Sequence, residues 1–248
     1  MTRLAYRVLG NPVHLGILIV ADHASNAVPA DVTLGIDQCR LKDHIAWDIG
    51  VEPVACSMVQ ANGHAAILGN YSRLVVDLNR NRDEDGVVPA CSDGLIIPGN
   101  DITGPGRESR IRKYYDPYHD KLAKILTDSR PSLILSLHSF TPRLETRKQE
   151  ARPWEIGVLY NEQDTPSRIA IGYLAGRNVQ VGDQLPYSGK VLNATMNRHA
   201  EANQIPYIGI EMRQDLVSHK AGQERFTQIL TDMCHFVSEK LGLAVQKQ

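Results

Sequence analysis

The sequence predicts an α/β fold, a single-domain three-layer sandwich over residues 1–248 with a mixed, largely parallel central sheet. Three observations carry this prediction. Short, continuous apolar runs rich in β-branched residues are typical of strands buried on both faces of a parallel sheet. Segments with apolar residues at helical spacing lie between these runs. Hydrophobic residues make up 42% of the 248 residues, and no segment of linker composition divides them, which favours one core.

Six apolar runs are predicted to form strands. The first, Leu-Gly-Ile-Leu-Ile-Val-Ala at residues 15–21, is continuous, β-branched and strand-sized. The run at 132–137 follows a proline, a residue that often separates elements. The predicted strands are residues 15–21, 65–69, 73–77, 132–137, 156–160 and 207–211.

Three segments have apolar residues at helical spacing and are predicted as helices. Pro53, inside the first segment, requires a late helix start or a kink. Pro117 falls in the first turn of the second segment, where proline is tolerated, and an apolar stripe from Tyr118 to Leu126 follows it. The predicted helices are residues 43–58, 115–129 and 224–241.

Composition excludes several classes of protein. The 27 basic and 28 acidic residues give a net charge of −1, which argues against a nucleic-acid partner or an anionic membrane surface. No apolar run approaches the roughly 18 residues that a membrane-spanning helix needs. The four cysteines are scattered, and the first residues lack a signal-peptide pattern. We therefore expect a cytoplasmic protein with four reduced, mostly buried thiols; the sequence carries no signal of its oligomeric state.

Polar side chains follow the predicted strands. His23 comes after the first strand, His138 follows the fourth, and Glu211 ends the sixth. Ligands of open α/β sheets gather at the carboxyl ends of the strands, where these residues would meet. A neutral imidazole is the commonest metal ligand, and a carboxylate ending an apolar strand suits a general base. Each residue also has a structural interpretation, such as a turn, a hydrogen-bonded buried histidine or a Glu211–Arg213 ion pair.

A polar segment after the third run adds donors for an anion. Asn79 and Arg80 offer planar N–H groups suited to a carboxylate, although a solvated charge run is the alternative. With two histidines, these are the parts of a metal-assisted hydrolase. The motifs H-E-x-x-H, G-x-S-x-G, G-x-G-x-x-G and the P-loop are absent from the sequence.

Four separated motifs resemble the N-formylglutamate amidohydrolase family. They are His-Ala-Ser-Asn-Ala-Val-Pro from residue 23, Asp-Leu-Asn-Arg from 77, Leu-His-Ser-Phe-Thr-Pro from 137 and Gly-Ile-Glu-Met-Arg-Gln-Asp from 209. The likeness runs from about residue 17 to 230 in the family's order. It implies hydrolysis of N-formyl-L-glutamate, an anionic small molecule, to formate and glutamate, a late step of histidine degradation.

The family is in turn similar to zinc carboxypeptidases and aspartoacylase-like deacylases. This similarity implies a zinc-carboxypeptidase-like fold and one bound Zn²⁺, or another divalent metal, held by His23 and His138. In the wider group an H-x-x-E motif supplies a further ligand, but this chain has Asn26 at that position. Either Asn26 or a carboxylate elsewhere, for which Asp48 is our candidate, would complete the metal shell.

The same similarity implies roles around the substrate. Glu211 falls where the general base sits, and it would move a proton from water to the leaving amine. The other implied roles are carbonyl polarisation and oxyanion stabilisation by Arg73, carboxylate binding by Asn79 and Arg80, substrate covering by Tyr187, and binding of a second carboxylate by Arg213.

Two alternatives remain open. The site could hydrolyse another N-acyl amino acid or a carboxypeptidase-type peptide bond, since fold does not determine substrate and the polar loop 141–154 could select it. The missing glutamate of the H-x-x-E motif also leaves open a metal-free, non-catalytic scaffold that binds amino acids.

Overall fold

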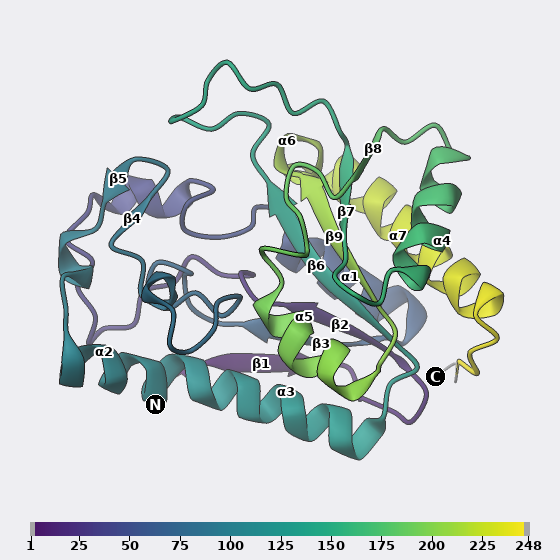
Figure 1. The fold of residues 1–248 in the computed structure, drawn as a ribbon, viewed down its shortest axis with the longest axis horizontal. Coiled ribbons are helices and arrows are strands. Elements are labelled where there is room, and N and C mark those ends of the chain that lie inside the picture. Colours follow the sequence, from purple (N-terminus) through teal and green to yellow (C-terminus); the bar gives the residue numbers. More distant parts are fainter. Residues whose placement is uncertain (1–2, 246–248) are drawn as a thin grey trace.

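A seven-stranded sheet forms the centre of the computed structural model, and helices cover both of its faces (Figure 1). The structure describes residues 3–245; residues 1–2 and 246–248, which the expected domain includes, lie outside that description. The sheet strands are β1 (Tyr6–Leu9), β2 (Ile17–Ala21), β3 (Ala65–Gly69), β6 (Leu133–Phe140), β7 (Ile156–Leu159), β8 (Val181–Asp183) and β9 (Tyr207–Arg213).

The sheet is mixed and mostly parallel, as predicted. Its order is β1-β3-β2-β6-β9-β7-β8. The four central strands, β3, β2, β6 and β9, are parallel to one another. Strand β1 pairs antiparallel with β3, and β7 pairs antiparallel with β9 and parallel with β8. The carboxyl ends of the central strands therefore meet at one edge.

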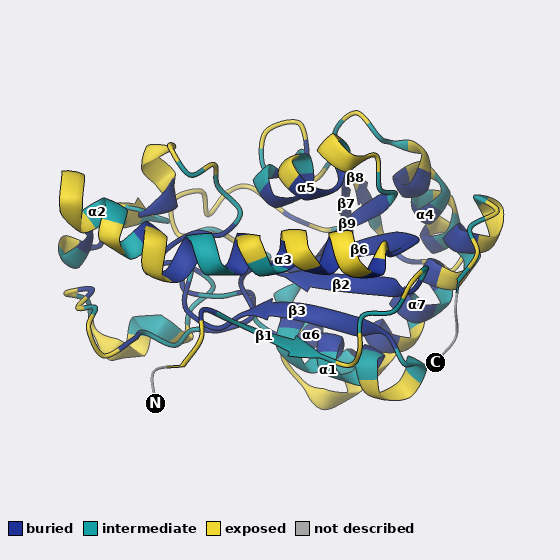
Figure 2. Cartoon of the chain, turned by 90° about the horizontal axis from the view of Figure 1, so that it is seen from below, coloured by how far each residue is buried: buried dark blue, intermediate teal, exposed yellow. Residues whose placement is uncertain are grey.

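Successive side chains of the central strands point to opposite faces of the sheet, so each face has its own hydrophobic core. In β2, Ile17 and Ile19 face the layer of α1, α4 and α7, whereas Leu18 and Val20 face α3 and α5. Figure 2 shows β2 and β3 buried while α3 keeps an exposed stripe toward solvent. The helices of these layers are α1 (Val51–Asn62), α3 (Asp116–Ser129), α4 (Thr165–Ala175), α5 (Ala194–His199) and α7 (Lys220–Lys240).

Shorter elements complete the described chain. Helix α2 (Gly104–Arg110) runs through a π-helical turn (Ile111–Tyr115) into α3, and α6 (Gln214–Val217) follows β9. Strands β4 (Cys91–Ser92) and β5 (Leu95–Ile96) form a separate hairpin. The 3₁₀ turns are Gln38–Lys42, Asp85–Val87, Pro98–Asn100 and Glu201–Asn203. Among the described residues, no helix combines the length and apolarity required to cross a membrane.

Three expectations need correction. The run 73–77 is a buried turn and not a strand: Ser72 O accepts a hydrogen bond from Val75 N (2.9 Å), and the apolar side chains are buried by packing without strand pairing. The helix expected over 43–58 begins only at Val51, which places Pro53 in the first turn, where a missing N–H is tolerated. All four cysteines are free, but only Cys234 is buried.

Candidate active site

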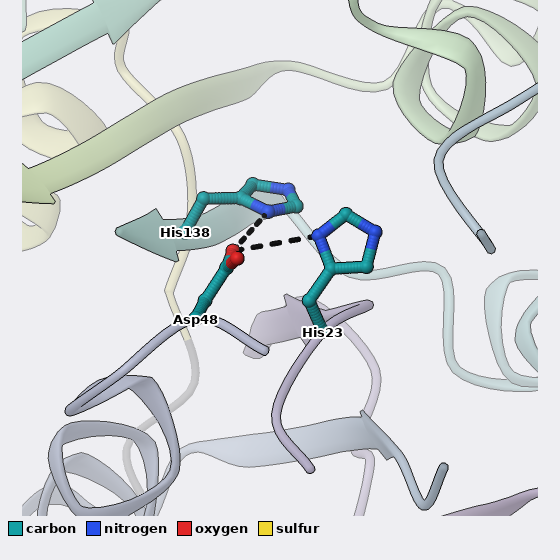
Figure 3. A group of neighbouring side chains, drawn as sticks. All are labelled: His23, Asp48 and His138. Atoms are coloured by element: carbon teal, nitrogen blue, oxygen red, sulfur yellow. Dashed lines mark hydrogen bonds and ion pairs between the residues drawn. The ribbon is translucent and has the colours of Figure 1, made fainter. Parts of the chain in front are cut away.

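His23, Asp48 and His138 meet at the carboxyl edge of the sheet (Figure 3). His23 lies two residues beyond β2, and His138 lies near the end of the neighbouring strand β6. Asp48 comes from the turn before α1, and its backbone N donates to the carbonyl of His23 (2.9 Å). The late start of α1 therefore leaves Asp48 outside the helix and beside both histidines.

The side chains of this triad converge on one buried point. Asp48 Oδ2 lies 2.9 Å from His138 Nδ1 and 3.4 Å from His23 Nδ1. The three candidate ligand atoms all lie within 4.8 Å of one another, and the three residues are at most 7% exposed. Such a compact set of two imidazoles and a carboxylate is a candidate metal site.

The outer nitrogen of each histidine faces a second carboxylate. His23 Nε2 lies 2.7 Å from Asp77 Oδ1. His138 Nε2 lies 3.8 Å from Asp22 Oδ2, while Asp22 Oδ1 accepts a hydrogen bond from Tyr118 (2.6 Å). At hydrogen-bond distance, as between Asp77 and His23, a carboxylate behind the imidazole places the proton on the outer nitrogen and leaves the inner one to bind a metal.

The donor set fits a zinc ion. The buried Nδ1 of His23 has no hydrogen-bond partner among the described residues, as expected of an atom that serves as a ligand. Two imidazole nitrogens and one carboxylate oxygen would leave the fourth position of a tetrahedral ion open. The residues that would hold it are His23, Asp48 and His138.

Charges around the triad favour protonated histidines in the metal-free protein. Burial lowers the pKa of His23 and Arg73 lowers it further, but Asp77 and Asp48 outweigh both and raise it to about 9. Burial also lowers the pKa of His138, but Asp48 and Glu211 outweigh that effect and raise it. Despite burial, His23 and His138 hold the pKa of Asp48 well below its ordinary value. A metal ion must therefore displace a proton here.

Zinc binding to the metal-free protein at pH 7 is expected to release at least one proton per ion. The reason is that His23, with a pKa of about 9, holds a proton at pH 7 and loses it only as the pH rises through that value. Titration calorimetry in buffers of different ionisation enthalpy measures the number. His44 lines the same cavity but burial lowers its pKa, so His44→Gln should release the same number. Release near zero in the wild type would contradict the charge assignment.

Glu211 lies beside His138 in the sheet. The two residues are register partners across β6 and β9, and Gly157 of β7 is the partner of Glu211 on its other side. A side chain at Gly157 is excluded, because a Cβ there would lie 2.3 Å from the carbonyl oxygen of Leu185 and 3.3 Å from Glu211 Cβ. This close packing fixes the backbone and Cβ of Glu211 beside His138, and Glu211 lines the same cavity as the triad.

The environment of Glu211 suits a general base. The residue is 8% exposed, and its Oε2 atom is buried without a hydrogen-bond partner among the described residues. Burial raises the pKa of Glu211 and Asp48 adds to this, while His138 and Arg73 oppose it; the result is about 7. A base with a pKa near the working pH combines a useful charged fraction with proton affinity.

A cavity of about 640 Å³ opens over these residues. Its walls come from the segment after β3, from the loop 141–154 between β6 and β7, and from the loop after β8. Of the residues predicted from the sequence, the cavity is lined by His23, Asp48, Arg73, Asn79, Arg80, His138, Tyr187 and Glu211.

The segment from Arg73 to Arg80 is held by its neighbours so that donors face the cavity. Arg73 Nη2 lies 2.7 Å from Asp77 Oδ2, and its Nη1 lies 3.6 Å from Asp48 Oδ1. Asn79 Oδ1 accepts from the backbone N of Thr195 (3.0 Å), so its NH₂ group is the part left to donate to a ligand. The carbonyl of Arg80 accepts from Tyr115 of the π-helical turn (2.8 Å), while the Arg80 side chain stays about one-third exposed.

The structure does not bring Asn26 or Arg213 into the cavity. Asn26 Nδ2 donates to the carbonyl of Leu41 (2.8 Å). Arg213 Nε lies 2.9 Å from Asp215 Oδ1, and its Nη1 donates to the carbonyl of Pro153 (2.9 Å). Strand β9 ends at Arg213 and α6 follows at once. The Arg213 side chain is bonded to groups beside this connection and does not line the cavity.

Sequence reasoning missed three residues of the site. Asp77 begins one of the motifs named above and Asp22 directly precedes another, but their positions behind the histidines depend on the tertiary structure. Arg152 belongs to the polar loop 141–154 and lines the cavity while only 5% exposed. A basic residue in a polar loop carries no signal of burial, so nothing in the sequence distinguished it from Arg143 or Arg147.

Comparison with known proteins identifies the relatives of this chain. The profile of the family described as N-formylglutamate amidohydrolase matches residues 15–218. No curated protein sequence matches the chain. The crystal structure of Atu2144 from Agrobacterium tumefaciens is similar over 97% of both chains, with 26% identity and a TM-score of 0.91. An N-formylglutamate amidohydrolase from Ralstonia eutropha JMP134 has a similar fold at 18% identity, with a TM-score of 0.75 over 96% of this chain and 98% of that one.

Proposed function

The chain belongs to the N-formylglutamate amidohydrolase family, and we propose that it is a zinc-dependent hydrolase of N-formyl or N-acyl acidic amino acids. Its substrate would be a small anionic molecule such as N-formyl-L-glutamate, cleaved at the amide bond to formate and glutamate. Such a reaction would serve histidine degradation. The observation that carries the proposal is the buried His23–Asp48–His138 triad at the floor of a polar cavity, with Glu211 beside it.

Each group in and around the triad would have a separate role in hydrolysis. A divalent ion held by the triad would supply Lewis-acid activation of a water molecule and of the amide carbonyl. Glu211 accepts a proton from the attacking water and delivers it to the nitrogen of the leaving amine. Arg73, fixed by Asp77, offers positive charge to the oxygen of the tetrahedral intermediate. Asp77, hydrogen-bonded to His23, keeps that histidine oriented throughout.

The cavity also has donors for the substrate's α-carboxylate. The NH₂ group of Asn79 and the partly exposed guanidinium of Arg80 lie next to each other in the sequence and line the same cavity. A planar guanidinium binds a carboxylate with two parallel hydrogen bonds. Tyr187, in the loop after β8, lines the same cavity and would cover the bound substrate.

The position of Asp48 supports a metal site despite the missing glutamate of the H-x-x-E motif. That absence was the reason to consider a metal-free binding scaffold. Asp48 places a buried carboxylate 3.4 Å from His23 Nδ1, so a third ligand would be present without a residue at position 26. This observation favours a hydrolase over the scaffold.

The purified protein is expected to contain about one zinc ion per chain and to release formate from N-formyl-L-glutamate. Metal content is measured by mass spectrometry, and formate release is assayed before chelation, after chelation and after zinc is restored. Chelation should abolish release and zinc should restore it. Zinc without release would keep the hydrolase and direct the search to other N-acyl amino acids. Neither metal nor release, even with added zinc, would overturn the proposal.

A further inference from the structure

Arg152 is a buried cation at the wall of the cavity. It lies in the loop between β6 and β7, which extends past the carboxyl end of β6 in Figure 1. The residue is 5% exposed and lines the same cavity as the triad. A buried guanidinium is costly unless an anion neutralises it, so the partners of Arg152 indicate what the cavity is built to hold.

Within the described part of the chain, Arg152 has only neutral hydrogen-bond partners. Its Nη1 donates to the hydroxyl of Tyr187 (3.0 Å) and, at 3.4 Å, to the carbonyl of Thr141. Its Cζ lies 5.1 Å from the centre of the Tyr187 ring. Its Nε is buried with no hydrogen-bond partner in residues 3–245, and none of the ion pairs within that range includes Arg152.

Other arginines at this cavity already have carboxylate partners. Arg73 pairs with Asp77 and Asp48, Arg80 lies 3.9 Å from Asp77, and Arg147 lies 3.6 Å from Glu150. Arg152 is thus the buried guanidinium of the cavity whose charge no described residue balances. A ligand with a second carboxylate would balance it.

We propose that Arg152, together with the hydroxyl of Tyr187, binds the side-chain carboxylate of the substrate and makes the enzyme selective for N-acyl derivatives of dicarboxylic amino acids. The Tyr187 hydroxyl accepts from Arg152 and keeps its own proton to donate to the carboxylate. Asn79 and Arg80 take the α-carboxylate. Arg152 therefore takes the role of binding the second carboxylate, which the family resemblance implied for Arg213. This inference rests on the proposed function for the identity of the reaction.

A purely structural role for Arg152 makes a different prediction. If Arg152 only positioned Tyr187 or the loop, its loss would affect acidic and neutral substrates equally. Charge recognition affects the acidic substrate alone, because a neutral amide does not need a counter-ion. Glutamate and glutamine derivatives differ at this one group and have nearly the same size, so they separate the two roles.

The test compares N-formyl-L-glutamate with N-formyl-L-glutamine in the wild type and in Arg152→Met. We expect the wild type to prefer the glutamate derivative in kcat/KM by about 100-fold. Arg152→Met should abolish that preference while changing kcat/KM for the glutamine derivative less than about threefold. Arg152→Lys, which keeps the charge without the planar fork, should retain a reduced preference. The matched control is Arg147→Met, an exposed arginine of the same loop and cavity, which should keep the wild-type preference.

A binding measurement makes the test independent of turnover. Calorimetry with L-glutamate and L-glutamine on the zinc-loaded protein should give tighter binding of glutamate, and Arg152→Met should remove the difference. Arg152-dependent selection of glutamate without any hydrolysis would overturn the proposed function but uphold this inference. A wild type that does not distinguish the two ligands in either experiment overturns it. So does an Arg152→Lys or Arg152→Met protein that weakens both equally.

Discussion

Replacing Glu211 with Gln is expected to lower kcat for amide hydrolysis by about 10³-fold and to leave zinc binding intact. The amide keeps the shape of the carboxylate but cannot accept the proton of the attacking water or return it to the amine. Glu211 is not a member of the triad, so the metal ligands stay in place. Formate release measures the loss, and metal analysis of the same sample measures the zinc content.

A matched control for this variant exists in the same cavity. Glu150 also lines the cavity, but its side chain is 47% exposed and lies beside Arg147, so Glu150→Gln should keep wild-type activity. Loss of activity in both variants, or less than tenfold loss in Glu211→Gln, would place the general base elsewhere.

The stability of the metal-free protein gives an independent check that Glu211→Gln folds. The folded-state pKa of Glu211, about 7, lies above its ordinary value, so the charged form costs stability that grows as the pH rises from about 4.5 to 7. The neutral amide removes that cost. The chelated variant should therefore have a higher Tm than the chelated wild type at pH 8, and the difference should shrink toward pH 5.

Replacing Asp48 with Asn is expected to weaken zinc binding by more than 100-fold and to remove activity with it. Asp48 is the only carboxylate of the triad, and even carboxylates behind the ligands contribute 10–100-fold to metal affinity. Asp77→Asn should therefore fall between Asp48→Asn and the wild type. Competition with a fluorescent zinc chelator measures the affinities.

The control for this prediction is Asn26→Ala. Asn26 stands at the H-x-x-E position, but its side chain is hydrogen-bonded to Leu41, and it takes no part in the triad. Zinc affinity should remain that of the wild type. If Asn26→Ala lost zinc while Asp48→Asn retained it, the third ligand would be Asn26 and the assignment of Asp48 would be wrong.

Much of the architecture follows from local patterns. Five of the six predicted strands correspond to strands of the sheet, because continuous apolar runs of this length are stable where both faces are covered. The exception, 73–77, has an apolar centre flanked by Arg73 and Asp77, and its apolar side chains are buried in a turn. An apolar run predicts that its side chains are buried, but it does not by itself predict that the segment pairs with a strand. The edge strands β1 and β8 were missed, because they are short and partly exposed.

The sequence alone determined the fold class, the family and the place of His23, His138 and Glu211 at the sheet edge. These residues could be placed because parallel strands bring their carboxyl ends to one edge of the sheet, independently of the loop conformations. Only the tertiary structure decided that Asp48 joins the histidines, that Asp77 and Asp22 stand behind them, and that Arg152 rather than Arg213 lines the cavity. These contacts join residues up to 116 positions apart, from Asp22 to His138. They depend on where α1 starts and on how the loops cross the edge of the sheet. No local sequence pattern encodes either feature.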